Sequence, residues 1–200
     1  MRLLPLFAIL LALFSAACGT PSIDASAPAS PDAPANSAPE TSAAQNDDAQ
    51  LPERPAAIFV VRHAEKESGD DPRLTPEGQE RAAALVPLLE SAGIDAIYAT
   101  QWRRTQETAA PIAQALGLDV HIVETSDGFE GELAARVGGK HAGQVVLIIG
   151  HSNTNPVLLD ALGAAEAPTI SDDDYDDVYL MLYPNGEPRL LRLGYGAPTP

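Results

Sequence analysis

Two histidines and two arginines follow predicted strands at the points where those strands end. Arg62 and His63 come directly after an apolar, β-branched run at 57–61. Arg104 lies in the segment after a second run at 94–99, and His151 follows Gly150 after a third run at 144–149. Because ligands in open α/β sheets bind at the carboxyl ends of the strands, we expect these side chains at one rim of the sheet.

These four residue types together suit phosphoryl transfer. A guanidinium binds phosphate oxygens through a planar, permanently charged fork. An imidazole that stays unprotonated is a competent nucleophile, and neighbouring arginines favour its neutral form. Each residue alone is more often a solvated loop group or a structural histidine. Four of them at three strand ends favour a common site.

Three segments carry a resemblance to a known family. The segments are 62–66 (RHAEK), 100–109 (TQWRRTQETA) and 150–154 (GHSNT). In this order and spacing they resemble the three motifs of the histidine phosphatase, or phosphoglycerate mutase-like, superfamily. The resemblance runs from about residue 57 to residue 193. A further segment, 74–78 (LTPEG), is similar to the family's LTxxG helix start, whose role is mainly structural.

The resemblance implies a role for each of the four residues. It implies that His63 takes the phosphoryl group as a phosphohistidine intermediate. It also implies that Arg62, Arg104 and His151 bind that group and stabilise its transition state. The expected activity is hydrolysis of phosphate monoesters on a small phosphorylated substrate, with no metal and no other cofactor.

The general acid is the point at which the chain departs from many relatives. The family commonly carries a glutamate after the third strand, within an insertion, to protonate the leaving oxygen. The span from Arg104 to His151 is short, as in compact phosphohistidine phosphatases. Glu124 is the best-placed candidate, with Asp127 and Glu130 behind it. Without an acid, substrates with good leaving groups would be favoured.

The same residues also allow other functions. The short span also fits a protein phosphohistidine phosphatase, and loss of the acid would leave a phosphate-binding or scaffold domain. A mutase is disfavoured because the insertion that encloses phosphoglycerates is missing. A metal site built from His63, His151 and carboxylates lacks any recognised ligand spacing. The acidic run at 172–177 is interpreted as a solvated loop rather than a cation site.

Strands alternate with helices along the part of the chain that must position these residues. This alternation predicts an α/β fold, with three α/β/α layers and a mostly parallel central sheet. A hairpin closed by Pro184, Asn185 and Gly186 is expected at the end. Strands are predicted at 57–61, 94–99, 120–123, 144–149, 178–183 and 189–193, and helices at 75–92, 104–116, 131–137 and 155–162.

The amino-terminal segment is typical of an exported protein. A short positive region, an apolar run and small residues precede Cys18, which predicts a signal peptide at 1–18. Cys18 resembles the cysteine of a bacterial lipobox, although Ser15 stands where the family has leucine. Lipidation there would tether the protein to the periplasmic or extracytoplasmic face of a membrane without spanning it. Because Cys18 is the single cysteine, no disulfide within the chain is possible.

Composition divides the rest of the chain. Residues 19–55 are rich in alanine, proline and serine and are predicted to be a disordered linker. The phosphatase-like domain is expected at 56–194 and a short tail at 195–200. The net charge of −16 argues against nucleic acid as a partner. A phosphate site in so acidic a protein must be a local cluster of positively charged side chains.

Overall fold

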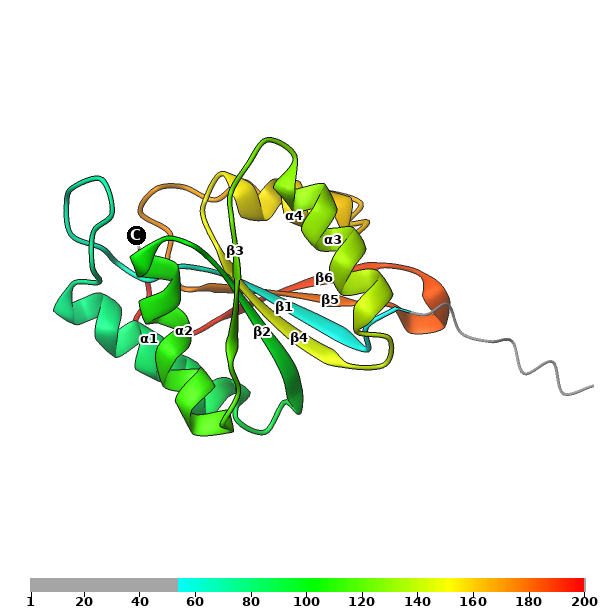
Figure 1. Ribbon diagram of the computed structural model, residues 1–200, viewed down its shortest axis with the longest axis horizontal. Coiled ribbons are helices and arrows are strands. Elements are labelled where there is room, and N and C mark those ends of the chain that lie inside the picture. The colour runs from blue at the N-terminus through cyan, green and yellow to red at the C-terminus, as the bar shows by residue number, and fades with distance from the viewer. Residues whose placement is uncertain (1–53, 200) are drawn as a thin grey trace, which may run out of the picture. The chain divides into compact units, whose positions relative to one another are not determined.

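The computed structural model describes residues 54–199, which fold around a six-stranded sheet in the order β3-β2-β4-β1-β5-β6 (Figure 1). The first four of these strands run parallel. Strand β5 pairs antiparallel with β1, and β6 pairs antiparallel with β5 at the edge. The predicted α/β fold with a mostly parallel sheet is therefore confirmed. The strands are β1 (Ala57–Arg62), β2 (Ile94–Thr100), β3 (Val120–Val123), β4 (Val145–Gly150), β5 (Asp177–Leu182) and β6 (Arg189–Gly194).

Helices cover both faces of this sheet (Figure 1). Helices α1 and α2 lie on one face, and α3 and α4 lie on the other. A 3-10 turn, η1 (Pro184–Gly186), joins the two strands of the predicted hairpin. The helices are α1 (Pro76–Leu89), α2 (Arg103–Leu116), α3 (Phe129–Lys140) and α4 (Thr154–Ala161).

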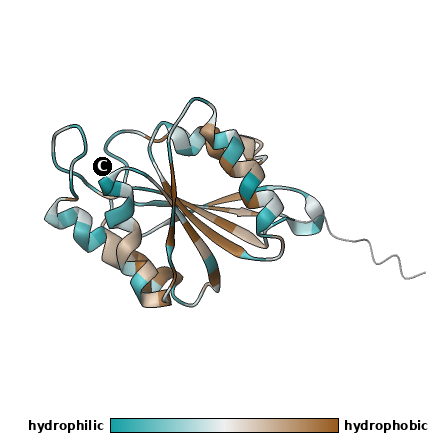
Figure 2. Cartoon of the chain, viewed as in Figure 1, coloured by the Kyte–Doolittle hydropathy of each residue, from teal (hydrophilic) through white to brown (hydrophobic). Residues whose placement is uncertain are grey.

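Alternating side chains of β1 divide the hydrophobic core into two parts. Ile58 and Val60 pack in the cluster under α3 and α4, whereas Phe59 and Val61 pack in the cluster under α1 and α2. A parallel sheet with both faces covered needs such nearly continuous apolar strands. Figure 2 shows the hydrophobic colouring concentrated on the central strands. Burial of β1 on both faces makes its carboxyl end a rigid support for the loop that begins there.

Helix α1 begins as the sequence predicts. The side chain of Thr75 accepts a hydrogen bond from the backbone N–H of Gly78, and Pro76 occupies the first turn. The helix ends at Leu89 rather than Ala92, because the chain turns there through a bond from Ala92 N to Leu89 O. Gly93 then takes the left-handed conformation, with φ of 70°.

Gly78 is the point at which α1 touches the loop after β1. A Cβ atom at this position would collide with the backbone carbonyl of Glu65. We expect Gly78→Ala to lower the free energy of unfolding by about 3 kcal/mol, the upper range for overpacking a tight contact. Gly138→Ala in α3 is the matched control, because its Cβ would enter open space. It should stabilise the protein by about 0.5–1 kcal/mol. Urea unfolding measures both, and equal effects would contradict the prediction.

Helix α3 is longer than predicted. The helix predicted at 131–137 begins at Phe129 and continues through Gly138 and Gly139 to Lys140. Phe129, Leu133 and Val137 form its buried face at helical spacing. Tertiary packing of that face overrides the weak helix propensity of glycine.

The chain after β6 packs onto the domain. The ring of Tyr195 is buried in the core cluster under α1 and α2. Thr199 donates its hydroxyl to Asp176 at 2.6 Å, and its backbone N–H also contacts that carboxylate. Residues 195–199 therefore extend the folded part beyond the strand at which we predicted it to end.

The predicted signal peptide at 1–18 with Cys18, and the predicted linker up to residue 53, lie outside the described residues. No helix within residues 54–199 has the length and apolar character needed to cross a membrane.

Candidate active site

His63 is the first residue after β1, and it lies at the carboxyl ends of the parallel strands. Its backbone N–H donates to Gly150 O, which extends the β1–β4 pairing by one step. Its side chain is 3% exposed, and its Nδ1 lies 2.8 Å from Ala64 O. Because a carbonyl can only accept, Nδ1 carries the ring proton. The lone pair of neutral His63 therefore lies on Nε2, the nitrogen available for attack.

The surroundings keep His63 uncharged. The pKa of His63 is lowered to about 3, mainly by burial and against the raising effect of the Ala64 hydrogen bond. The charges of His151, Arg62 and Arg104 contribute to this lowering. A neutral imidazole over the whole physiological pH range is the state that a nitrogen nucleophile needs.

Arg62 is held from the far end of the chain. Its Nη1 donates to Ser171 O at 2.8 Å and to Asp174 O at 2.9 Å. Its guanidinium carbon lies 4.0 Å from the centre of the Tyr175 ring, a cation–π distance. The side chain is thus fixed by the loop before β5, while Nε is buried without a partner among the described residues.

Arg104 approaches from the first turn of α2. Its guanidinium lies 5.0 Å from the Trp102 ring. Burial lowers the pKa of Arg104, Asp71 raises it, and the charge of Arg62 lowers it. The effect of Arg62 on the pKa of Arg104 shows that the charge of Arg62 acts at Arg104. The two guanidiniums form the local cluster of positive charge that a phosphate site needs in a protein of such acidic composition.

His151 completes the group from β4. Its ring centre lies 5.4 Å from that of His63, in an edge-on arrangement. Its Nε2 lies 2.9 Å from Thr100 Oγ1, at the end of β2. The pKa of His151 is lowered to about 4, mainly by burial and also by the charges of Arg104 and Arg62. The structure therefore brings together all four residues that we placed at this rim of the sheet.

Further side chains hold the loop after His63. Thr108 accepts from Ala64 N at 3.0 Å and donates to Arg104 O at 2.7 Å, so it joins this loop to α2. The carboxylate of Glu65 accepts from Arg81 Nε at 2.9 Å and from Arg81 Nη2 at 2.7 Å. Sequence reasoning missed Arg81, whose helical position gives no sign of a buried partner. The same guanidinium donates from Nη1 to Tyr195 O.

Glu124 makes no hydrogen bond or ion pair with the four residues within the part of the chain that the structure describes. Its side chain is exposed, and it lines a surface hollow with Ile122, Glu132 and Arg136. Among residues 54–199 no hydrogen bond or ion pair joins a carboxylate to His63 or His151. The assignment of Glu124 as general acid thus remains a prediction without a contact to support it.

The acidic run before β5 has partners within the protein. The carboxylates of Asp174, Asp176 and Asp177 gather closely. Arg192 contacts Asp177 at 2.6 Å and Asp174 at 3.6 Å, and Thr199 contacts Asp176. Asp177 is buried, so this part of the run is structural rather than the solvated loop that we predicted.

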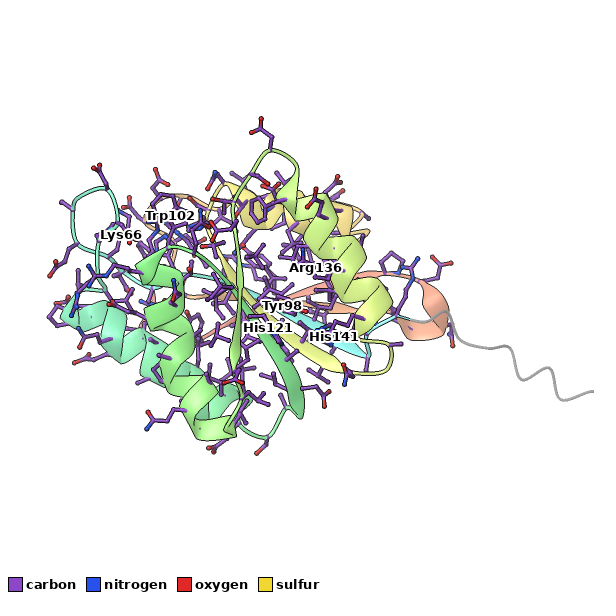
Figure 3. All side chains as sticks on the ribbon, viewed as in Figure 1. Lys66, Tyr98, Trp102, His121, Arg136 and His141 are labelled. Carbon is purple, nitrogen blue, oxygen red and sulfur yellow. The ribbon has the colours of Figure 1, made fainter. Side chains whose placement is uncertain are left out.

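The other two histidines lie elsewhere. His141 is buried and lies 2.8 Å from the Tyr98 hydroxyl, and the exposed His121 packs against the same ring. In Figure 3 these residues lie together, whereas Lys66 and Trp102 mark the end of the sheet that carries the site. Neither His121 nor His141 contributes to that site.

Part of the chain matches a known protein family. A family model described as histidine phosphatase superfamily (branch 1) matches residues 58–127, which include the segments around His63 and Arg104. The match covers about a third of the chain and shows that this part is similar to that superfamily. No curated protein sequence matches the chain.

Solved structures share the fold at low sequence identity. A phosphoserine phosphatase from Entamoeba histolytica, in complex with 3-phosphoglyceric acid, is 16% identical with a TM-score of 0.53, and the match covers 71% of this chain and 97% of that one. The protein histidine phosphatase SixA, complexed with tungstate, is 15% identical with a TM-score of 0.55, over 69% and 96% of the two chains. A mycobacterial glucosyl-3-phosphoglycerate phosphatase is 14% identical with a TM-score of 0.50, over 71% and 99%.

Proposed function

We propose that this protein is a metal-independent phosphatase that hydrolyses phosphate monoesters through a phosphohistidine at His63. The observation that carries the proposal is the state of His63. Its Nδ1 proton is engaged by Ala64 O, which leaves a neutral Nε2 between two guanidiniums and a second imidazole.

The proposed reaction has two steps. In the first, Nε2 of His63 attacks phosphorus, the P–O ester bond breaks, and the leaving oxygen takes a proton from solvent. In the second, water attacks phosphorus and returns a proton to solvent, the N–P bond breaks, and inorganic phosphate and the free imidazole form. Arg62 and Arg104 offset the charge on the equatorial oxygens in both steps. Their guanidiniums are already fixed or stacked in the free protein, so little reorganisation is needed.

The test is phosphate release from a chromogenic monoester by the purified protein in the presence of a chelator. A phosphoenzyme quenched during turnover should be stable in alkali and labile in acid, as expected of an N–P bond. Turnover that the chelator abolishes, or an acid-stable phosphoenzyme, would overturn the proposal. Phosphate binding without turnover would support a binding or scaffold domain instead.

A second candidate is a protein phosphohistidine phosphatase. The observation in its favour is that no carboxylate among residues 54–199 contacts His63 or His151. A phosphorylated imidazole is a good leaving group and needs less help from an acid than an alkoxide does. A comparison of kcat/KM for a phosphohistidine protein and for small esters distinguishes the two candidates.

We also propose that the protein is exported and lipid-anchored through Cys18, which would place the reaction at the periplasmic face of a membrane. The support is the sequence pattern around Cys18. Incorporation of labelled fatty acid into the protein, and its loss in Cys18→Ser, would test the anchor. Release of unlabelled protein into the soluble fraction would contradict it.

The two depressed imidazole pKa values predict acid sensitivity. His63 and His151 have folded pKa values of about 3 and about 4, below their ordinary value of 6.5. Below pH 6.5 the unfolded chain therefore binds protons that the folded chain does not. The free energy of unfolding has its full value above pH 6.5. As the pH decreases below 6.5, this free energy falls by up to about 1.4 kcal/mol per pH unit for each histidine.

Thermal unfolding between pH 8 and pH 5 measures this loss. The double variant His63→Gln, His151→Gln should show a flatter dependence of Tm on pH than the unmodified protein. An equally steep dependence in both proteins would show that other groups cause the loss.

A further inference from the structure

A small cavity lies between the carboxyl ends of β2 and β4 and the first turns of α3 and α4. Its volume is about 10 Å³, close to the smallest space that holds one water molecule. Much of its lining is apolar and includes Phe129 and Leu133 from α3. The side chains of Thr154 and Asn155, at the start of α4, also line it, next to Gly150. The cavity therefore combines room for one small molecule with polar groups that could bind it.

Asn155 is a buried polar residue whose side chain lacks partners. It is 1% exposed, and neither its Nδ2 nor its Oδ1 has a hydrogen-bond partner among residues 54–199. A buried amide without any hydrogen bond destabilises the folded state, and buried polar groups nearly always have a partner. Because this amide lines the cavity, a partner can reach it there.

The amide of Asn155 and the hydroxyl of Thr154 come together at Gly150. A Cβ atom on Gly150 would collide with Asn155 Oδ1 and would lie 3.4 Å from Thr154 Oγ1. Thr154 Oγ1 accepts from His151 N at 3.2 Å, so its own proton is available for a further acceptor. A water molecule can accept this proton and donate to the amide oxygen, and so satisfy both side chains.

The same two residues hold the backbone of His151. Thr154 Oγ1 accepts from His151 N, and Asn155 N donates to His151 O at 2.9 Å. The side chain of Asn155 also packs on Gly150, the residue before His151. An amide that turned away from the cavity to find a partner would disturb this backbone. A water that satisfies the amide in its present place therefore helps to keep His151 at the rim of the sheet.

We propose that the cavity binds one ordered water molecule through Asn155 and Thr154, and that Asn155 is thereby a positioning residue for His151. The positioning role rests on the proposed function, because it concerns the site at which the phosphoryl group would bind. The water itself does not, since it can be detected in a protein without activity.

The water is detected by nuclear Overhauser effects in the ¹⁵N-labelled full-length protein in solution. The side-chain amide protons of Asn155 should show an effect from a water molecule that stays bound for longer than the protein takes to tumble. The exposed side-chain amide of Gln114 in α2 is the internal control and should show no such effect. The absence of a long-lived water at Asn155 would overturn the proposal.

Asn155→Leu keeps the approximate size of the side chain but removes its hydrogen-bonding groups. It should raise the equilibrium constant of unfolding in urea by about tenfold, the effect of losing one buried hydrogen bond. If the amide had no partner, the same change would leave stability unchanged or raise it, because an unpaired polar group would be removed. Gln114→Leu is the matched control and should change this constant by no more than about twofold, as is usual at an exposed position.

Binding of inorganic phosphate separates positioning from structural support. At a temperature at which both proteins are fully folded, Asn155→Leu should raise the Kd of phosphate by about tenfold, through the displacement of His151. The backbone N–H signal of His151 should shift in the same variant. An unchanged Kd and an unchanged signal would overturn the positioning role. If the unmodified protein neither binds phosphate nor hydrolyses a monoester, the proposed function fails together with this role, and the Overhauser measurement alone decides on the water.

Discussion

His63→Ala is expected to lower kcat for phosphate-ester hydrolysis by about 10⁴-fold or more, the range measured when a covalent nucleophile is removed. The reason is that, in the proposed reaction, Nε2 of His63 forms the bond to phosphorus. His151 is the other imidazole at the site, and the proposed function gives it the binding of the phosphoryl group instead of the attack on phosphorus. The measurement is steady-state release of phosphate, together with the yield of trapped phosphoenzyme.

The control for this variant is His121→Ala. His121 is exposed on β3 and packs against Tyr98, so its loss should leave kcat within about twofold, as is usual for a surface substitution. Phosphate binding should survive in His63→Ala, because both guanidiniums remain. Retention of more than a few per cent of the activity would show that another residue is the nucleophile.

Arg62→Lys is expected to lower kcat/KM by about 10²–10³-fold, the cost of removing one fixed donor to the transition state. Lysine keeps the charge but not the planar fork. Arg62 uses Nη1 for two backbone carbonyls and places its plane against Tyr175. An ammonium cannot satisfy both carbonyls, stack on the ring and still present donors to phosphate. The loss should appear in kcat/KM and in the Kd of inorganic phosphate.

Arg73→Lys is the matched control. Arg73 is exposed and lies 3.8 Å from Glu107, in a surface ion pair that contributes little. Its substitution should leave both parameters unchanged. Equal effects of the two variants, or a normal kcat/KM in Arg62→Lys, would show that the fork of Arg62 is not used.

The sequence was sufficient to predict the strand ends and hence the four residues at the site. Arg62, His63 and His151 come at or just after the ends of apolar runs typical of buried strands, and chain topology brings such ends together. Arg104 was placed at the same rim by the segment that follows the second run, although an arginine in a helix start with another arginine beside it is ordinarily solvated.

The groups that hold these residues could not be predicted. Arg62 binds carbonyl oxygens of Ser171 and Asp174, and every residue has a carbonyl, so no residue type marks them. The Glu65–Arg81 pair depends on how α1 lies against the loop after β1. The hydrogen bonds that join His151 to Thr100 and Thr100 to Thr105 depend on where β4 places His151. These are tertiary contacts, which a pattern along the chain does not encode.

The contacts of Arg62 and Arg81 make the site depend on residues far along the chain. Arg62 is fixed by the backbone of Ser171 and Asp174, and Arg81, which holds the carboxylate of Glu65, reaches Tyr195 O. A chain cut before residue 171 would keep all four strand-end residues but would lack these supports. Such a chain should therefore not hold Arg62 and Glu65 in place, even though β1, β2 and β4 are present.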